Sequence, residues 1–407
     1  MSSIRLMTVE AARAAMLATI APLSTEAVPT GPQALGRTLA EPLTASRDQP
    51  PFDAAAMDGY AVTASGLHDT SAVTLTVIGE SAAGRGFARS VGDGEAVRIF
   101  TGAPTPPGTA FVVPQENAER TGDTVVIAPR DQSGPYFRPR GIDFRSGDSL
   151  LPAGVRLDPW RIGLAAAAGR GTLAVHRRPR VAILSTGEEL VAPGDAPGPD
   201  QIFNSGTPSV AALAHLWGAE AVLLPSAGDH AAAIAASVAP VEADLLVTIG
   251  GASVGDHDLV KPALETLGLT LQVASIAVRP GKPTWFGQLA DGRRVLGLPG
   301  NPASALVCAE LFLKPMLQAF GGRVPGPRMQ AARLTTPLPA NGAREHWMRA
   351  QLSTTADGAW QVTPLPDQDS SLVSVFAVAD ALVCRPAHAP AEAAGSPVAV
   401  LPLERLA

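Results

Sequence analysis

The sequence Ala-Asp-Leu-Leu-Val-Thr-Ile at residues 243–249 runs directly into Gly-Gly-Ala-Ser-Val-Gly-Asp-His-Asp at residues 250–258. A short apolar run that ends in paired glycines predicts a buried parallel strand, followed by a loop that lets a ligand approach its backbone. In open α/β sheets, ligands bind at the loops that follow the carboxyl ends of the strands. The two aspartates of this loop suit a phosphate whose charge is bridged by a divalent cation. The alternative is a tight strand-to-helix turn in which Asp258 caps the helix.

Around this stretch, residues 180–320 alternate strand-like and helix-like segments, which predicts a doubly wound parallel sheet. After Leu-Pro-Gly-Asn-Pro at 298–302 we expect a last helix, with Asn301 as its N-cap and Pro302 at its first position. Glu310 on this helix is expected to face solvent or a partner. The expected strands are 180–184, 221–224, 243–249 and 294–298, and the helices between them are 208–216, 231–238 and 261–267.

Both flanks have the pattern of small β domains, because short alternating runs are separated by Gly and Pro. The pattern predicts a β domain within about residues 50–140 and a C-terminal β-barrel or sandwich from about residue 328. A helix over 158–168 is expected to connect the first β domain to the sheet. The expected strands are 73–78, 96–100, 111–113 and 124–127 in the first domain, and 330–334, 347–352, 360–363 and 398–401 in the second.

Composition limits the class of protein. A chain of 407 residues is expected to form two to four domains. With 17% charged residues and no apolar stretch near membrane-spanning length, we expect a soluble protein, and the helical period of the first 20 residues does not suggest export. The net charge of −6 without a basic cluster argues against nucleic acid as the partner. Cys308 and Cys384 lie in apolar surroundings, which predicts buried free thiols and a reducing cytoplasm.

Further loops place functional groups at turns. Asp58 and Thr101 each lie at a turn, where they are either ligand-binding groups or simple caps. Asp143 lies among three arginines, a pattern that on its own predicts a solvated ion-pair patch. The sequence Ser-Thr-Gly-Glu-Glu-Leu at 185–190 follows the first strand of the sheet and supplies Glu188 and Glu189 at the same edge as the Gly250 loop.

Positive charge is expected in the proline-stiffened turn Arg-Pro-Gly-Lys-Pro at 279–283, which suits an oxyanion. This turn does not match the P-loop pattern, so a standard nucleoside triphosphatase is disfavoured. The sequence also contains no nucleophile elbow, no His-Glu-x-x-His and no cysteine ligand set. His257 is favoured as a structural hydrogen-bonding residue over a catalytic acid or base.

Taken in order, six motifs resemble the molybdopterin molybdenumtransferase family, which includes the MoeA proteins and the E domain of gephyrin. The resemblance covers nearly the whole chain, although each motif alone would be weak. The motifs are Pro-Pro-Phe-Asp-x-x-x-Met-Asp-Gly-Tyr-Ala at 50–61, Thr-Gly-Ala-x-x-Pro-x-Gly at 101–108, Ser-Thr-Gly-x-Glu-Leu at 185–190, Gly-Gly-x-Ser-x-Gly-x-x-Asp at 250–258, Pro-Gly-Lys-Pro at 280–283 and Leu-Pro-Gly-Asn-Pro-x-Ser at 298–304.

The resemblance implies a multidomain fold of α/β and β parts. A central molybdopterin-binding-like doubly wound α/β domain is expected at 178–326 and a C-terminal β-barrel at 327–407. A discontinuous helical and dimerisation domain is expected at 1–48 and 142–177, with an inserted β domain at 49–141.

The resemblance also implies a reaction in molybdenum cofactor biosynthesis. Adenylylated molybdopterin and molybdate are the substrates, AMP is released, and Mg²⁺ is required. Family members are homodimers, and the site receives residues from the partner's N-terminal region. A molybdopterin adenylyltransferase and the recipient molybdoenzymes or their chaperones are the other partners implied, with no nucleic acid and no membrane.

Carried over motif by motif, the roles fall on particular residues of this chain. The family's catalytic positions match Asp58, Thr101, Asp143, Glu189 and Asp258. The substrate-binding positions match Gly250, Gly251, Ser253, Gly255, Asp256, Asp229, Lys282, Pro299, Gly300, Asn301 and Ser304. Because cationic and hydroxyl donors suit an oxyanion, molybdate contacts are expected at Arg279, Lys282, Arg349, Ser370 and Ser371. Because carboxylate oxygens suit magnesium, its ligands are expected at Glu188, Glu189, Asp229 and Asp258.

The chain departs from the family pattern at several positions. Ala55 stands where Ser is usual, Ala110 where Asp is usual, Arg279 where Lys is common and Ile142 where an acid often precedes Asp143. Residues 369–371, Asp-Ser-Ser, replace a Gly-Ser-Gly or Gly-Ser-His pattern. These changes leave open a non-catalytic molybdopterin-binding carrier or assembly scaffold. An adenylyltransferase is a third possibility, but it would not require the N-terminal insertions or the C-terminal barrel.

Overall fold

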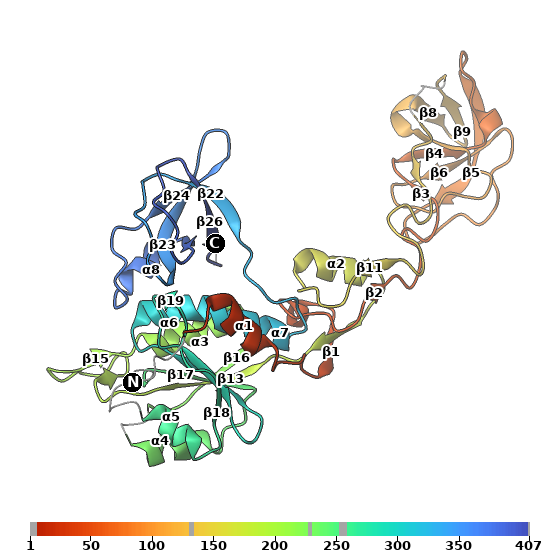
Figure 1. The fold of residues 1–407 in the computed structure, drawn as a ribbon. Helices are drawn as coiled ribbons and strands as arrows, with labels where there is room; N and C mark the ends of the chain where they lie inside the picture. Colours follow the sequence, from red (N-terminus) through yellow and green to blue (C-terminus); the bar gives the residue numbers. More distant parts are fainter. Residues whose placement is uncertain (1–5, 130–133, 227–229, 252–258, 406–407) are drawn as a thin grey trace.

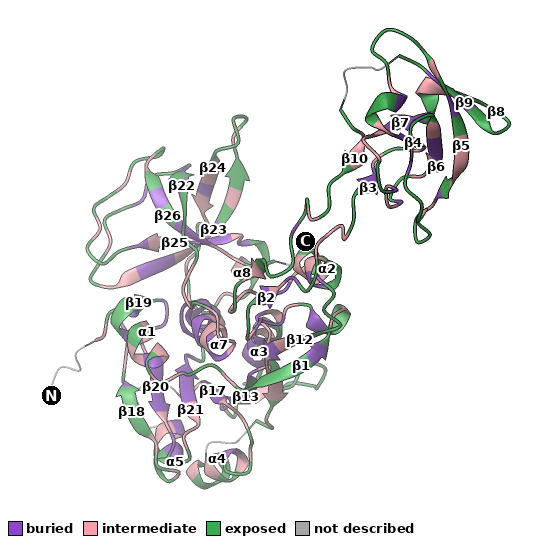
Figure 2. Cartoon of the chain, turned by 90° about the vertical axis from the view of Figure 1, so that its right-hand side faces the viewer, coloured by how far each residue is buried: buried purple, intermediate pink, exposed green. Residues whose placement is uncertain are grey.

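A computed structural model describes residues 6–129, 134–226, 230–251 and 259–405 (Figure 1). In both ribbon views the chain is elongated: the central α/β domain lies beside the C-terminal barrel, and the first β domain lies at the far end of a connector (Figures 1 and 2). The central domain and the barrel therefore form one end of the molecule, and the first β domain forms the other.

The central domain is built on a six-stranded sheet in the order β16-β13-β17-β21-β20-β18. The first four strands pair in parallel, which confirms the predicted doubly wound arrangement for that part. Strand β20 runs antiparallel to both of its neighbours, β21 and β18. Only residues 289–293 separate β20 from β21, and a parallel crossover needs a dozen or more residues. The strands are β16 (Glu220–Leu223), β13 (Arg180–Ser185), β17 (Leu245–Ile249), β21 (Arg294–Leu298), β20 (Trp285–Gln288) and β18 (Thr270–Val273).

Helices cover both faces of this sheet, and each face has its own apolar core (Figure 2). One core contains buried residues of α1 (Val9–Leu17), α3 (Gly206–Leu216) and the α6–α7 helix. The other contains buried residues of α4 (Ala231–Val238) and α5 (Val260–Glu265). The predicted helices of this domain are therefore confirmed, with ends that shift by a few residues.

The last helix of the domain corrects two expectations. It runs without a break through α6 (Pro302–Cys308), a π-helical turn η4 (Ala309–Leu313) and α7 (Lys314–Phe320). By length and hydropathy this 19-residue helix could cross a membrane, contrary to the sequence analysis, but 83% of its apolar window is buried inside the protein, as in a core helix. Glu310 does not face solvent: it is 4% exposed, within the π turn, and its carboxylate pairs with Lys314.

The C-terminal domain is a closed five-stranded barrel, as predicted. Its strands pair in the cycle β23-β24-β22-β26-β25-β23, and β19 of the central domain pairs in parallel with β23. The sequence analysis missed β25 because its apolar run lacks a clear alternation. The elements are β22 (Gln330–Leu334), β23 (Glu345–Thr354), β24 (Trp360–Pro364), α8 (Ser374–Val378), β25 (Ala381–Arg385), β26 (Pro397–Pro402) and β19 (Val278–Arg279).

The first β domain contains a six-stranded sheet in the order β7-β4-β6-β5-β9-β8. Two apolar clusters fill it, so it has a core of its own. Its elements are β4 (Gly59–Val62), η2 (Ala64–Gly66), β5 (Val73–Ser81), β6 (Glu95–Ile99), β7 (Phe111–Pro114), η3 (Gln115–Asn117), β8 (Ala118–Thr121) and β9 (Thr124–Ile127).

The connector consists of short antiparallel pairs and the predicted helix, α2 (Pro159–Ala167), which Asp158 caps through a bond from the Arg161 N–H. Its strand pairs join segments that are far apart in the sequence, so the chain crosses to the first β domain and returns. The other connector elements are β1 (Thr25–Pro29), η1 (Pro32–Ala34), β2 (Leu43–Thr44), β11 (Ser149–Leu151) and β12 (Thr172–His176). The pair of β3 (Ala54–Ala55) and β10 (Phe137–Arg138) lies in the first β domain, and the parallel pair of β14 (Leu190–Val191) and β15 (Ile202–Phe203) lies in the central domain.

Candidate functional site

Three loops at the carboxyl end of the central sheet meet through their backbones. The Thr186 N–H donates to the Ile249 carbonyl at 3.2 Å, and the Gly250 N–H donates to the Leu298 carbonyl at 3.2 Å. A side chain at Gly250 would place its Cβ 2.8 Å from the Thr186 carbonyl oxygen, and one at Gly300 would lie 3.4 Å from the Gly250 Cα. Gly250 also has a φ of +92°, so only glycine fits this approach without strain. The predicted positions Gly250, Gly251, Pro299 and Gly300 are thus gathered at one point.

The acidic loop after β13 lies at the same edge. The main chain of this loop is fixed, because the Ile202 N–H donates to the Glu189 carbonyl at 2.7 Å and the Gln201 amide donates to the Glu188 carbonyl at 3.2 Å. Both glutamate side chains remain exposed, and the Glu189 carboxylate lies against Gly187. Two exposed carboxylates are therefore presented next to the meeting point of the loops.

Several predicted site residues lie outside the described residues. These are Asp229, Ser253, Gly255, Asp256 and Asp258. Within the described part of the chain, no group of three or more His, Cys, Asp or Glu side chains is arranged to hold a metal ion.

A loop of the C-terminal barrel completes the edge. The Asn301 side-chain amide donates to the Ser370 hydroxyl at 2.8 Å, and the Ala303 N–H donates to the Ser370 carbonyl at 3.1 Å. Asn301 occupies the predicted N-cap of α6, but its side chain makes no cap hydrogen bond, since it bridges to the barrel instead. Ser304, one turn further along α6, is buried at 4% exposure.

Arg349, on strand β23, brings a fully buried guanidinium beside this loop. Its Nη2 donates to the Asp369 carbonyl at 2.8 Å, while its Nε and Nη1 atoms have no hydrogen-bond partner among the described residues. Burial lowers the pKa of Arg349, although Asp367 and Asp369 partly oppose this, and the charge of Arg279 lowers it further. Unpaired, buried donors of this kind suit an anion.

Arg279 approaches Arg349 through the pairing of β19 with β23, in which Arg279 lies opposite His346. His346 is 7% exposed, and burial together with the charges of Arg279 and Arg349 lowers its pKa to about 4. Because His346 is therefore neutral at pH 7, the positive charge of this cluster comes from the arginines.

The remaining predicted oxyanion contacts differ from one another. Lys282 is exposed in the turn that follows Arg279, and its carbonyl accepts the Ile276 N–H at 3.0 Å. The Ser371 hydroxyl instead donates to the Asp369 carboxylate at 2.6 Å, which lowers the pKa of Asp369. Ser371 is thus engaged with an acidic neighbour, whose negative charge lies near Arg349.

Asp58 and Thr101 form a second set in the first β domain. The Thr101 N–H and hydroxyl both donate to Asp58 Oδ1 at 2.7 Å, and these bonds lower the pKa of Asp58. Asp58 therefore joins two loops and does not simply cap its own turn. Asp143 is exposed in the connector, where its N–H donates to the Gln49 carbonyl at 3.0 Å.

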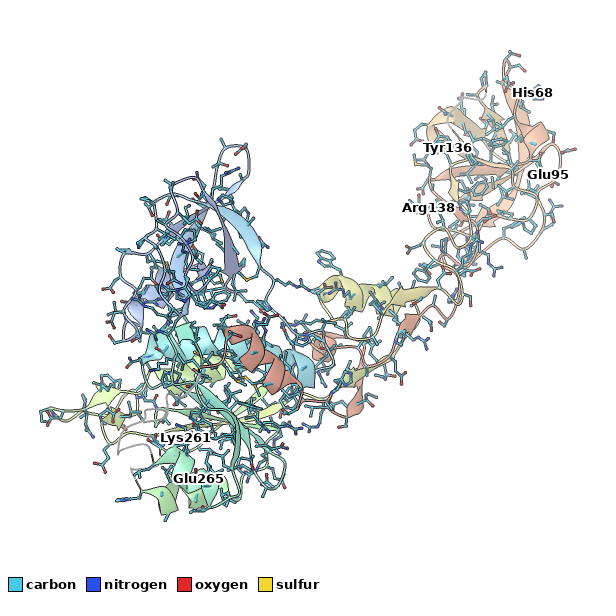
Figure 3. All side chains as sticks on the ribbon, in the orientation of Figure 1. His68, Glu95, Tyr136, Arg138, Lys261 and Glu265 are labelled. Carbon is cyan, nitrogen blue, oxygen red and sulfur yellow. The ribbon has the colours of Figure 1, made fainter. Side chains whose placement is uncertain are left out.

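The Asp58–Thr101 pair and the strand-end loops lie at opposite ends of the elongated molecule (Figure 1). In Figure 3, Tyr136 and Arg138 lie in the first β domain, whereas Lys261 and Glu265 lie on α5 of the central domain. The connector separates these parts in both ribbon views (Figures 1 and 2). One chain alone does not bring Asp58 and Thr101 to the strand-end loops.

Three family models match consecutive parts of this chain. Models described as the MoeA N-terminal region (domain I and II), a probable molybdopterin binding domain and the MoeA C-terminal region (domain IV) match residues 7–169, 182–319 and 331–403. A molybdopterin molybdenumtransferase from Nostoc is 36% identical over 335 residues, which are 80% of this chain and 77% of the relative. One from Haemophilus influenzae is 33% identical over 379 residues, 92% of this chain and 93% of the relative. The chain belongs to the molybdopterin molybdenumtransferase family.

The fold agrees with this membership. A solved structure of a molybdopterin biosynthesis MoeA protein from Pyrococcus horikoshii covers 99% of this chain and is itself covered completely, with a TM-score of 0.83 and 31% identity. The resemblance predicted from six motifs is therefore confirmed. Since the N-terminal and C-terminal regions match as well as the central domain, the adenylyltransferase alternative loses its support.

One departure from the family pattern has a simple structural setting. Ala55, which stands where the molybdenumtransferases usually have Ser, is fully buried, and its N–H and carbonyl bond to Ala103 and Gly102. The backbone of Ala55 thus holds the Thr101 loop without help from a side-chain hydroxyl.

Sequence reasoning overlooked Arg98, which supports the Asp58 pair in this transferase. Its guanidinium lies over the rings of Tyr60 and Phe100, at 5.2 and 4.8 Å from their centroids, and donates to the Gly59 carbonyl at 3.2 Å. Its charge also lowers the pKa of Asp58. The sequence feature that could have indicated this role is the single arginine inside the otherwise apolar run 96–100.

Proposed function

We propose that this chain inserts molybdenum from molybdate into adenylylated molybdopterin and releases AMP. The observation that carries the proposal is the meeting of the Thr186, Gly250 and Gly300 loops with the Ser370 loop of the barrel. Exposed backbone at the carboxyl ends of parallel strands suits a phosphorylated ligand. Family membership supplies the reaction class.

The arginine cluster is proposed to bind molybdate. Arg349 offers two buried donors, and Arg279 and Lys282 supply exposed positive charge nearby. Fixed guanidinium donors bind tetrahedral oxyanions in a defined orientation. The Ser370 hydroxyl accepts from Asn301 and so can still donate to an oxyanion. Ser371, which already donates to Asp369, is a weaker candidate.

The carboxylates of the acidic loop are proposed to bind Mg²⁺. Glu188 and Glu189 are exposed and carry the hard oxygen donors that this ion prefers, and Asp229 and Asp258 are proposed as further ligands. When bound, the ion would neutralise negative charge on the phosphoryl oxygens. The chain's own role is to hold these carboxylates beside the glycine backbone, where the pyrophosphate is proposed to lie.

Asp58, Thr101 and Asp143 are proposed to complete the site from a second copy of the chain. The support is their separation from the strand-end loops within one chain (Figure 1). A homodimer in which each cleft receives the partner's first β domain would bring both sets together. We also propose a cytoplasmic location, with a molybdopterin adenylyltransferase and recipient molybdoenzymes or their chaperones as partners.

The test is AMP release from adenylylated molybdopterin by the purified protein, with molybdate and Mg²⁺ each present or omitted. Release that needs both ions would support insertion. Tight binding of the pterin without release would instead indicate a carrier or scaffold, an alternative that the engaged Ser371 and the nearby Asp369 charge favour. Absence of both binding and release would contradict the proposed substrate.

A further inference from the structure

A cavity of about 740 Å³ lies where the connector, helix α7 and the end of the barrel meet. Its walls are the turn at 153–156, α7 with the following segment 322–328, and residues 401–404. It shares no lining residue with the strand-end loops or with the Asp58 pair. A cavity of this size is in the range of small-molecule sites.

The lining is strongly charged, and basic groups outnumber acidic ones. Five basic side chains face two glutamates, which leaves an excess of three positive charges at pH 7 when both glutamates are ionised. The basic residues are Arg156, Arg161, Lys314, Arg323 and Arg328, and the acidic ones are Glu310 and Glu404.

Both glutamates already form ion pairs with two of the basic side chains, Lys314 and Arg156. Lys314 Nζ lies 3.1 Å from Glu310 Oε2 and 3.7 Å from Glu404 Oε2, and Arg156 Nη1 lies 3.1 Å from Glu404 Oε1. Arg161 pairs with Asp158, outside the cavity, at 3.1 Å. The charge that remains inside the cavity is therefore carried mainly by Arg323 and Arg328.

Arg323 is poorly compensated. Its Nη2 donates to the Trp217 carbonyl at 3.2 Å, but its Nε is buried without a hydrogen-bond partner among the described residues. Burial, together with repulsion from Arg156 and Arg328, lowers its pKa to about 10. Like charges held together without an anion destabilise the fold, so a bound anion would be stabilising here.

We propose that this cavity binds a small polyanion that carries phosphate groups, up to the size of a nucleotide. Arginine forks suit phosphate oxygens, and the excess positive charge favours a multiply charged ligand over a neutral one. The ligand would contact the connector, the central domain and the barrel at once. Its binding would therefore stabilise the arrangement of these three parts, separately from the proposed molybdenum insertion.

The test is calorimetric titration of the full chain with inorganic pyrophosphate, in wild type and in three variants. Arg328→Gln changes an exposed cavity residue, and Arg323→Gln changes the partly buried one. Arg333→Gln is the matched control, because this exposed arginine on β22 does not line the cavity and its loss alters net charge equally. We expect each cavity variant to raise Kd about tenfold or more, as for one lost charge-assisted contact, and the control to leave Kd unchanged.

Three results would overturn the proposal. One is the absence of pyrophosphate binding at millimolar concentration. Another is equal weakening in all three variants, which would reflect net charge only. The third outcome needs one further variant, Lys282→Gln: if it abolishes binding while the cavity variants retain it, the ligand occupies the strand-end cleft. Should Arg323→Gln fail to fold, Arg328→Gln alone decides, because its side chain is exposed.

Discussion

At the scale of single residues, hydrogen bonds and a nearby positive charge hold Asp58 of the first β domain in its ionised form. Two donors from Thr101 converge on one carboxylate oxygen, and Arg98 lies close by. Both effects stabilise the ionised form, so the pKa of Asp58 lies below its ordinary value. Asp58 is therefore charged throughout the physiological pH range.

We expect Asp58→Ala to reduce AMP release by about 100-fold or more, in line with the loss of one essential charged group at a reacting centre. The fold should persist, since the side chain is not part of the core, and circular dichroism would verify this. Glu119→Ala is the control, because this exposed carboxylate on β8 belongs to the same domain. Unchanged AMP release in Asp58→Ala would remove Asp58 from the site.

The two thiols give a second prediction at this scale. Cys308 is buried, as predicted, whereas Cys384 is only partly buried. Burial raises the pKa of Cys308 to about 12, and partial burial with the charge of Glu345 raises the pKa of Cys384 to about 12. Because the thiolate is the reactive form, neither should react with Ellman's reagent at pH 8 in the folded protein. Both should react after unfolding in guanidinium. Rapid reaction of either thiol in the native state would contradict the structure around it.

At the scale of elements, strand β23 of the barrel carries a buried group that titrates. His346 has a pKa of about 4 in the folded protein against 6.5 in the unfolded chain. The unfolded chain therefore binds a proton first as the pH falls below 6.5, and the folded state loses stability until the pH approaches 4. The free energy of unfolding that is lost through His346 reaches up to about 3 kcal/mol, since each pKa unit corresponds to about 1.4 kcal/mol.

We expect His346→Gln to remove this part of the acid sensitivity of the barrel. The measurement is guanidinium unfolding at pH 7 and pH 5, followed by tryptophan fluorescence, since Trp347 is buried on the same strand. Wild type should lose more stability than His346→Gln between these two pH values. His388→Gln, an exposed histidine outside the strands, is the control. Equal pH dependence in wild type and His346→Gln would show that His346 does not titrate as described.

The elements also show what the sequence could and could not predict. Strand β21 and helix α4 have the predicted ends, because clear apolar runs and glycine or proline boundaries define them. The placement of the 185–190 loop and the Gly250 loop at one edge of the sheet was predicted from the parallel strands, and the bond from the Thr186 N–H to the Ile249 carbonyl agrees with it. The inward turn of Glu310 did not, because helical periodicity assumes regular turns and η4 is π-helical. The bridge from Asn301 to Ser370 was equally invisible, since it depends on how two domains dock.

At the scale of the whole molecule, the division of the proposed site between two ends of the chain leads to a test of the dimer. Two variants that each disable one end should be inactive alone: Asp58→Ala in the first β domain and Lys282→Ala in the cleft. When both chains are unfolded together and refolded at equal amounts, half of the dimers should contain one chain of each kind. Every mixed dimer would then hold one intact site, made from the cleft of one chain and the β domain of the other.

We therefore expect the mixture to recover roughly a quarter of wild-type AMP release, because half of the dimers regain one of their two sites. A site formed within one chain would recover nothing, since every chain carries a defect. Mixing the folded variants without unfolding is the control for subunit exchange. Size-exclusion chromatography with light scattering would establish that the refolded species is a dimer. Recovery near a quarter, only after refolding together, would place Asp58 in the partner's cleft.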